Sequence, residues 1–128
     1  MIITFIMAVV IVPDAIALLY EDISALQLYE RIIDDTDDGY IILDIRVPEE
    51  YAEGYISGAI NIPLKQLGYS LYMLDKSKDI IVYCKIGVQS KIAAQVLANA
   101  GFKDVYNLTD GLEMWSYALE TSDGRVDI

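Results

Sequence analysis

Residues 79–101 read DIIVYCKIGVQSKIAAQVLANAG, in which a short loop joins an apolar run to an amphipathic one. The apolar run, Asp79 to Tyr83, is typical of a buried strand, and Cys84 follows at its carboxyl end. The residues after Ser90 repeat with helical spacing, and Gly101 predicts the end of that helix. We expect this helix to bury the apolar face made by Ile92, Ala93, Val96, Leu97 and Ala100.

Similar units lie on both sides of this one. Strands are predicted at residues 40–44, 59–62 and 104–108, and helices beginning after Ser24 and at 48–53, 64–74 and 112–119. Ser24 to Gln27 has the spacing of a capping box. Its helix is expected to bury Leu26, Tyr29, Ile32 and Ile33. Strands that alternate with helices predict an α/β fold with a parallel sheet covered on both faces. In such sheets the site lies outside the carboxyl ends of the strands, where Asp44 and Cys84 are placed.

Composition excludes several function classes. The 128 residues are one domain's length, and 55% of them are hydrophobic, which is enough for a core. Nine basic and 20 acidic residues give a net charge of −11, which repels nucleic-acid phosphates, so we expect no nucleic-acid partner. The chain has no histidine and one cysteine, which excludes His-based zinc sites, Cys–His catalytic pairs and an internal disulfide. The acidic run at residues 34–39 is too dense for an EF-hand, so we expect a loop and no metal site there.

The loop that begins with Cys84 has the features of an anion cradle. Gly87 at the bend allows successive backbone N–H groups to turn toward one point, and the following helix directs its positive end there. A thiol held at that point has a lowered pKa, and Lys85 adds a nearby cation. The alternative is that Cys84 is an inert, small residue of the core.

Four blocks of the sequence, in order, resemble the rhodanese family of sulfurtransferases. DIRVPEEY (44–51) is similar to the family's D-x-R-x-x-x-E-[YF], and GYISGAINIP (54–63) to its G-H-I-x-G-A-x-N-I-P, with Tyr55 in place of the usual His. CKIGVQS (84–90) is similar to the active loop C-R-x-G-x-R-S, with Lys85 and Gln89 in place of arginines. DGLEMW (110–115) is similar to G-G-x-x-x-W, with Asp110 in place of the first glycine.

The resemblance implies a single rhodanese-like domain with three layers, in which a mainly parallel sheet of about five strands has helices on both faces. It implies an enzyme in which Cys84 takes sulfane sulfur from a donor as a persulfide and passes it to cyanide or a thiol, including a protein thiol. No metal or organic cofactor is implied. The residues that would bind the substrate or the persulfide are Lys85, Ile86, Gly87, Val88, Gln89 and Ser90, with Asp44 and Arg46 as a border of the pocket. Arg46 and Glu50, four residues apart, are expected to form an ion pair.

One departure from the family pattern and one difference from a related family bear on function. The neutral Gln89 weakens the expected capture of thiosulfate, a dianion, and favours a persulfide or polysulfide donor. Ser90 stands where phosphatases of the related fold carry the arginine of C-x5-R, which argues against that chemistry. A non-catalytic rhodanese-like binding module is the alternative function.

The apolar segment 1–17 precedes the domain predicted for residues 18–128. It resembles a secretory signal in its apolar run and its Ala15-Ile16-Ala17 site, but it lacks a basic start. The other interpretation is an extra segment packed on the domain. We expect a cytoplasmic protein, or an extracytoplasmic or membrane-tethered one if residues 1–17 act as an anchor.

Overall fold

The computed structural model describes residues 19–127, so the expectations for residues 1–17 fall outside it. Its main sheet has five parallel strands, which confirms the predicted α/β fold. In spatial order these strands are β1 (Glu21–Ile23), β6 (Val105–Leu108), β5 (Asp79–Tyr83), β2 (Tyr40–Asp44) and β4 (Ile60–Asn61). The central position of β2 and β5 explains why both are continuous apolar runs.

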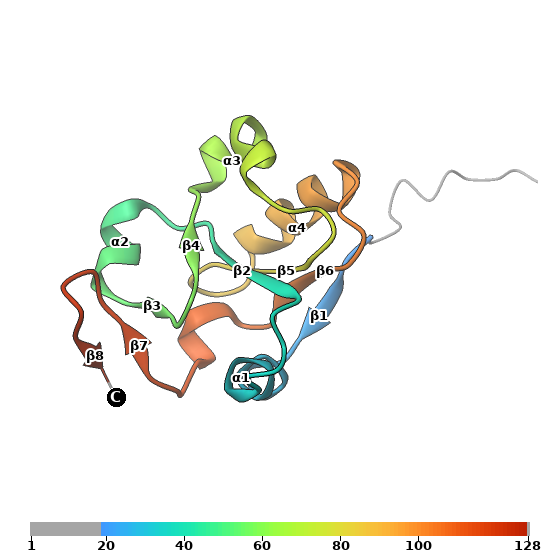
Figure 1. Cartoon of the computed structure of the whole chain (residues 1–128). Helices are drawn as coiled ribbons and strands as arrows, with labels where there is room; N and C mark the ends of the chain where they lie inside the picture. Colours follow the sequence, from blue (N-terminus) through green and yellow to red (C-terminus); the bar gives the residue numbers. More distant parts are fainter. Residues whose placement is uncertain (1–18, 128) are drawn as a thin grey trace, which may run out of the picture.

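Helices cover both faces of the main sheet (Figure 1). One face carries α1 (Ala25–Ile33), and the other carries α3 (Leu64–Ser70), a short 3₁₀ turn (Leu71–Met73) and α4 (Gln89–Asn99). A second, antiparallel sheet lies near α2 (Pro48–Glu53) and had no counterpart in the sequence predictions. It consists of β3 (Tyr55–Ile56), β7 (Leu119–Glu120) and β8 (Val126–Asp127). Among residues 19–127, none of the helices combines the length and the apolar character needed to cross a membrane.

The side chains of β5 divide the interior into two cores. Ile80, Val82 and Cys84 point into the core beneath α3 and α4, whereas Ile81 and Tyr83 point into the core on the α1 side. This alternation is the two-residue period of a strand, and it directs the Cys84 side chain toward the start of α4.

Two predicted helix faces were partly wrong. In α1 the residues turned toward the sheet are Ala25, Leu28, Tyr29 and Ile32, while Leu26 is 55% exposed and Ile33 is also exposed. In α4 the buried residues are Ser90, Ala93, Ala94 and Leu97, while Ile92 is 57% exposed. Both buried sets follow the i, i+3, i+4, i+7 series. Ala93 and Leu97 were predicted correctly, and close contact with the sheet explains why the small residues Ser90 and Ala94 are buried as well.

The closing helix predicted at residues 112–119 is also wrong. The chain forms only a 3₁₀ turn, Gly111–Met114, and then becomes extended. The N–H groups of Leu112 and Glu113 donate to the carbonyl oxygens of Cys84 and Lys85, both at 2.9 Å. This segment therefore supports the loop after β5 instead of continuing as a helix. Trp115 at its end is buried, as predicted for a core anchor.

Candidate active site

The Cys84 sulfur lies in a cradle built by its own loop. The backbone N–H groups of Gly87 and Ser90 donate to Sγ at 3.2 and 3.4 Å, and the thiol donates to the Ser90 hydroxyl at 3.3 Å. Burial raises the pKa of the Cys84 thiol, but the backbone N–H groups of Ser90, Gly87 and Ile86 act in the opposite direction, and the pKa lies below its usual value. Such a thiol forms a thiolate readily, and the same N–H groups are able to hold a negative sulfur species.

The cradle opens into a cavity of about 850 Å³. Only 3% of Cys84 is exposed, because its sulfur lies at the bottom of this cavity among core side chains. Its burial is expected for a core residue, whereas its place in the cavity wall is expected for a reactive thiol, so the reactivity of Cys84 stays a prediction. The cavity is lined by Ile45, Arg46, Val47, Glu50, Pro63, Leu64, Lys65, Cys84, Lys85, Ile86, Val88, Gln89 and Glu113.

The loop residues divide into two groups. Lys85, Ile86, Val88 and Gln89 are exposed and line the cavity, whereas Gly87 and Ser90 are buried beneath it. The binding roles predicted for these side chains stay predictions. The structure shows only that the two buried residues supply the N–H groups that contact the Cys84 sulfur.

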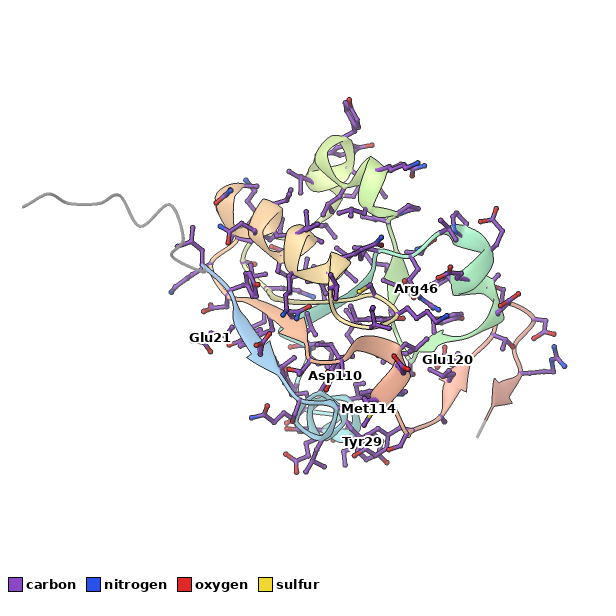
Figure 2. All side chains as sticks on the ribbon, turned by 180° about the vertical axis from the view of Figure 1, so that it is seen from behind. Glu21, Tyr29, Arg46, Asp110, Met114 and Glu120 are labelled. Atoms are coloured by element: carbon purple, nitrogen blue, oxygen red, sulfur yellow. The ribbon has the colours of Figure 1, made fainter. Side chains whose placement is uncertain are left out.

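Close backbone packing explains the glycine of this loop. Gly87 has φ of +86°, as expected for the bend, and a Cβ there would lie 2.9 Å from the Asp110 nitrogen. Gly111 faces the loop from the opposite side, and its Cβ would come within 2.8 Å of the Gly87 nitrogen. Asp110, the residue in place of a family glycine, also has a positive φ of 60°. Figure 2 places Asp110 and Arg46 in the turns that follow the main-sheet strands.

Arg46 pairs with Asp44 and not with Glu50, so the predicted ion pair is wrong. Its Nη2 donates to Asp44 Oδ2 at 2.7 Å and to the Gly54 carbonyl oxygen at 2.6 Å. Asp44 is 0% exposed, and a buried carboxylate needs a charged partner more than the exposed Glu50 does. Asp44 lies behind the cavity, while Arg46 lines it. Asn61 completes this turn by donating to the carbonyl oxygens of Asp44 and Arg46.

Charges at the cavity come from more elements than the sequence indicated. Lys65 of α3 joins Lys85 as a lining cation, and Glu50 of α2 and Glu113 of the 3₁₀ turn line the cavity as anions. The sequence analysis named Arg46 and the loop cation Lys85 at the pocket, but not Lys65, Glu50 or Glu113. The position of Lys65 two residues after the matched block 54–63 was the one available signal. Within residues 19–127, no cluster of three or more carboxylates and thiols has the arrangement of a metal site.

The chain is similar to known sulfurtransferases and rhodanese-related proteins. A family model described as "Rhodanese-like domain" matches residues 24–118. Thiosulfate sulfurtransferase GlpE of Coxiella burnetii is 35% identical over 108 residues, 84% of this chain and 98% of the relative. A sulfurtransferase of Allochromatium vinosum is 30% identical over 95 residues, 74% of this chain and 87% of the relative. The crystal structure of a rhodanese-related protein from Thermoplasma volcanium superposes with a TM-score of 0.69 at 32% identity, covering 78% of this chain and 97% of that one.

Proposed function

This chain belongs to the rhodanese-like domain family, and its relatives support a sulfurtransferase kind of function; we propose that Cys84 carries the transferred sulfur as a persulfide. The observation that carries this proposal is the pair of N–H groups, from Gly87 and Ser90, that converge on Sγ. Backbone donors of this kind stabilise a negative sulfur at a fixed place without a cofactor.

The loading step uses the thiolate of Cys84 as nucleophile. Its sulfur attacks the outer, sulfane sulfur of the donor, and a new S–S bond forms on Cys84. The bond between the sulfane sulfur and the rest of the donor molecule breaks. The electron pair of that bond leaves with the rest of the donor, which is sulfite in the case of thiosulfate. The Cys84 persulfide is an anion at its outer sulfur, a charge that backbone N–H groups are able to stabilise.

The unloading step regenerates the thiolate. A thiophilic acceptor, cyanide or a thiolate, attacks the outer sulfur, and the bonding electrons of the persulfide return to Cys84 Sγ. No second cysteine exists in the chain to accept the sulfur internally. The acceptor is therefore external, and the cavity over Cys84 is the route by which it approaches.

The lining of the cavity favours an organic donor over a small dianion. Apolar side chains make a large part of the wall, among them Ile45, Val47 and Leu64. Lys65 and Lys85 attract an anion, but Glu50 and Glu113 oppose them in the same cavity. The charge of Arg46, which also lines the cavity, is neutralised by Asp44. A persulfide attached to a carbon group can bury that group here, whereas thiosulfate meets a wall with little net positive charge.

Mass spectrometry of the intact protein tests this proposal. After incubation with an organic persulfide, polysulfide or thiosulfate, we expect a mass gain of one sulfur atom that a thiol acceptor removes. The Cys84→Ser variant is the control and gains nothing. If the wild-type protein also gains no sulfur from any of the three donors, the chain is a rhodanese-like binding module.

A further inference from the structure

A buried chain of hydrogen bonds leads from Cys84 to the edge of the main sheet. The Ser90 hydroxyl, which accepts from the thiol, donates to Asn107 Oδ1 at 2.5 Å. Asn107 Nδ2 donates in turn to Asp22 Oδ1 at 3.2 Å. Asn107 is 1% exposed and had no place in the sequence predictions.

The sheet register explains how these groups meet. Asn107 of β6 lies opposite Asp22 of β1 and, on its other side, opposite Val82 of β5. Side chains opposite one another in a parallel sheet share a face, so Asp22 and Asn107 both point to the α4 side. Ser90, in the first turn of α4, is fully buried against that face.

The hydrogen bonds of this series can run in only one direction, from Cys84 to Ser90 to Asn107 at one end and from Asn107 to Asp22 at the other. An ionised Asp22 only accepts, so the Asn107 amide must turn its NH₂ group toward the carboxylate and its oxygen toward Ser90. An amide oxygen also only accepts, and the single proton of the Ser90 hydroxyl is therefore used on Asn107. The Ser90 hydroxyl can therefore offer the Cys84 sulfur only a lone pair, so it accepts a hydrogen bond from the thiol and donates none to it.

We propose that Asn107 is a positioning residue for Cys84: by holding the Ser90 proton, it makes this hydroxyl an acceptor that favours the thiol over the thiolate. When the thiol loses its proton, the hydroxyl either faces the negative sulfur with a lone pair or turns and leaves the buried Asn107 oxygen without a donor. Both outcomes cost free energy. The loop N–H groups have the opposite effect, because they stabilise the thiolate. The balance between these two effects determines how readily the Cys84 thiol loses its proton.

This balance distinguishes the thiolate from the persulfide. The proposal rests on the proposed function only here, in naming the persulfide as the loaded state. In the persulfide the charge lies on the outer sulfur and not on Sγ, which is the atom that Ser90 contacts. The Ser90 hydroxyl, acting as a hydrogen-bond acceptor, therefore raises the free energy of the sulfur-free thiolate more than that of the persulfide. A thiolate of higher free energy is a more reactive nucleophile.

Other charged groups line the same cavity as Cys84, and the test must hold them constant. Those that line the cavity from the other elements are Arg46 from the turn after β2, Glu50 from α2, Lys65 from α3, Lys85 from the loop and Glu113 from the 3₁₀ turn. None of them is changed in the variants below, so their contributions cancel in each comparison.

The test is the rate of alkylation by iodoacetamide as a function of pH, which reports the thiol midpoint without any sulfur donor. We expect Asn107→Leu to lower the midpoint by about one to two units, the size of one hydrogen bond to a charged group, because the freed hydroxyl can donate to the thiolate. Ser90→Ala should lower it by less, since it removes the acceptor and supplies no donor. A rise of the midpoint in Ser90→Ala would show that the hydroxyl already donates to the thiolate and would overturn the proposal.

A third variant at the surface end of the chain serves if substitution in the core prevents folding. Asp22→Asn removes the group that orients the Asn107 amide, and Glu21→Gln is the matched control, because it removes the same charge from the adjacent residue. We expect a lower midpoint in Asp22→Asn than in Glu21→Gln. Equal midpoints would mean that Asp22 acts only through its charge, which contradicts the proposal. Because alkylation needs no sulfur donor, this result is independent of whether the protein transfers sulfur.

Discussion

Substitution of Gly87 by alanine tests whether the loop backbone creates the site. The residue has φ of +86°, and a conformation of this kind costs about 1–2 kcal/mol for a residue with a Cβ. The new Cβ would also lie 2.9 Å from the Asp110 nitrogen, a backbone atom that cannot turn aside like a side chain. We therefore expect the loop to move away from the turn at residues 110–111 and the Gly87 N–H to leave Sγ.

The loss at the sulfur can be sized from that hydrogen bond. Gly87 donates to Sγ at 3.2 Å, and a hydrogen bond to a charged group contributes about 1.5–3 kcal/mol. Divided by about 1.4 kcal/mol per pH unit, its loss raises the alkylation midpoint of Gly87→Ala by about one to two units relative to the wild type. Sulfur transfer at neutral pH should fall at least tenfold.

Gly58→Ala is the matched control. Gly58 has nearly the same φ, +80°, but a Cβ there meets nothing within 4 Å. In urea unfolding, we expect Gly58→Ala to lose about 1–2 kcal/mol of stability with unchanged alkylation, and Gly87→Ala to lose more stability and its reactivity. If Gly87→Ala keeps the wild-type midpoint and turnover, the cradle does not depend on this backbone conformation and our reasoning is refuted.

Three other substitutions or measurements probe the remaining parts of the site. Because the pKa of the Cys84 thiol is lowered, the wild-type protein should react with iodoacetamide with a midpoint below the free-cysteine value of about 8.5, and a midpoint at or above it would contradict the cradle. Gln89→Arg adds a cation to the cavity wall and should lower the KM for thiosulfate several-fold but not the KM for a neutral donor. Added salt should reduce this gain, since screening acts over about 8 Å at physiological ionic strength, and the distant Gln95→Arg should have no such effect. Arg46→Met leaves the buried Asp44 carboxylate without its partner and should lower the free energy of unfolding by about 3–5 kcal/mol in urea titration, whereas Arg46→Lys, which keeps the charge but not the planar donors, should lose less.

Elements with strong local signals were predicted closely. The predicted strands at residues 40–44 and 79–83 and the helix at 48–53 have the same bounds in the structure. The capping box after Ser24 is formed, with the Gln27 N–H donating to the Ser24 hydroxyl and the Gln27 side chain accepting from the Ser24 N–H. In each case, the residues that decide the conformation lie within a few positions of one another.

The errors share a different cause. The segment after Leu112 has the composition of a helix, but its N–H groups serve the carbonyl oxygens of a loop about 28 residues earlier in the chain. Arg46 has Glu50 at helical spacing, but the carboxylate that burial leaves most in need of a charge is Asp44. The local sequence pattern could not identify these hydrogen-bond and ion-pair partners, because their burial depends on how the helices and strands pack.

Local sequence is enough to specify the strand–loop–helix unit that presents Cys84, since the sulfur and the N–H groups that hold it lie within seven consecutive residues. The surroundings of that unit depend on packing: the cavity wall from α2 and α3, the turn that supports the loop, and the register that brings Asn107 and Asp22 behind Ser90. A cradle closed by neighbours in the chain is specified by local conformation. Contacts between strands and helices far apart in the sequence exist only after the whole sheet has assembled.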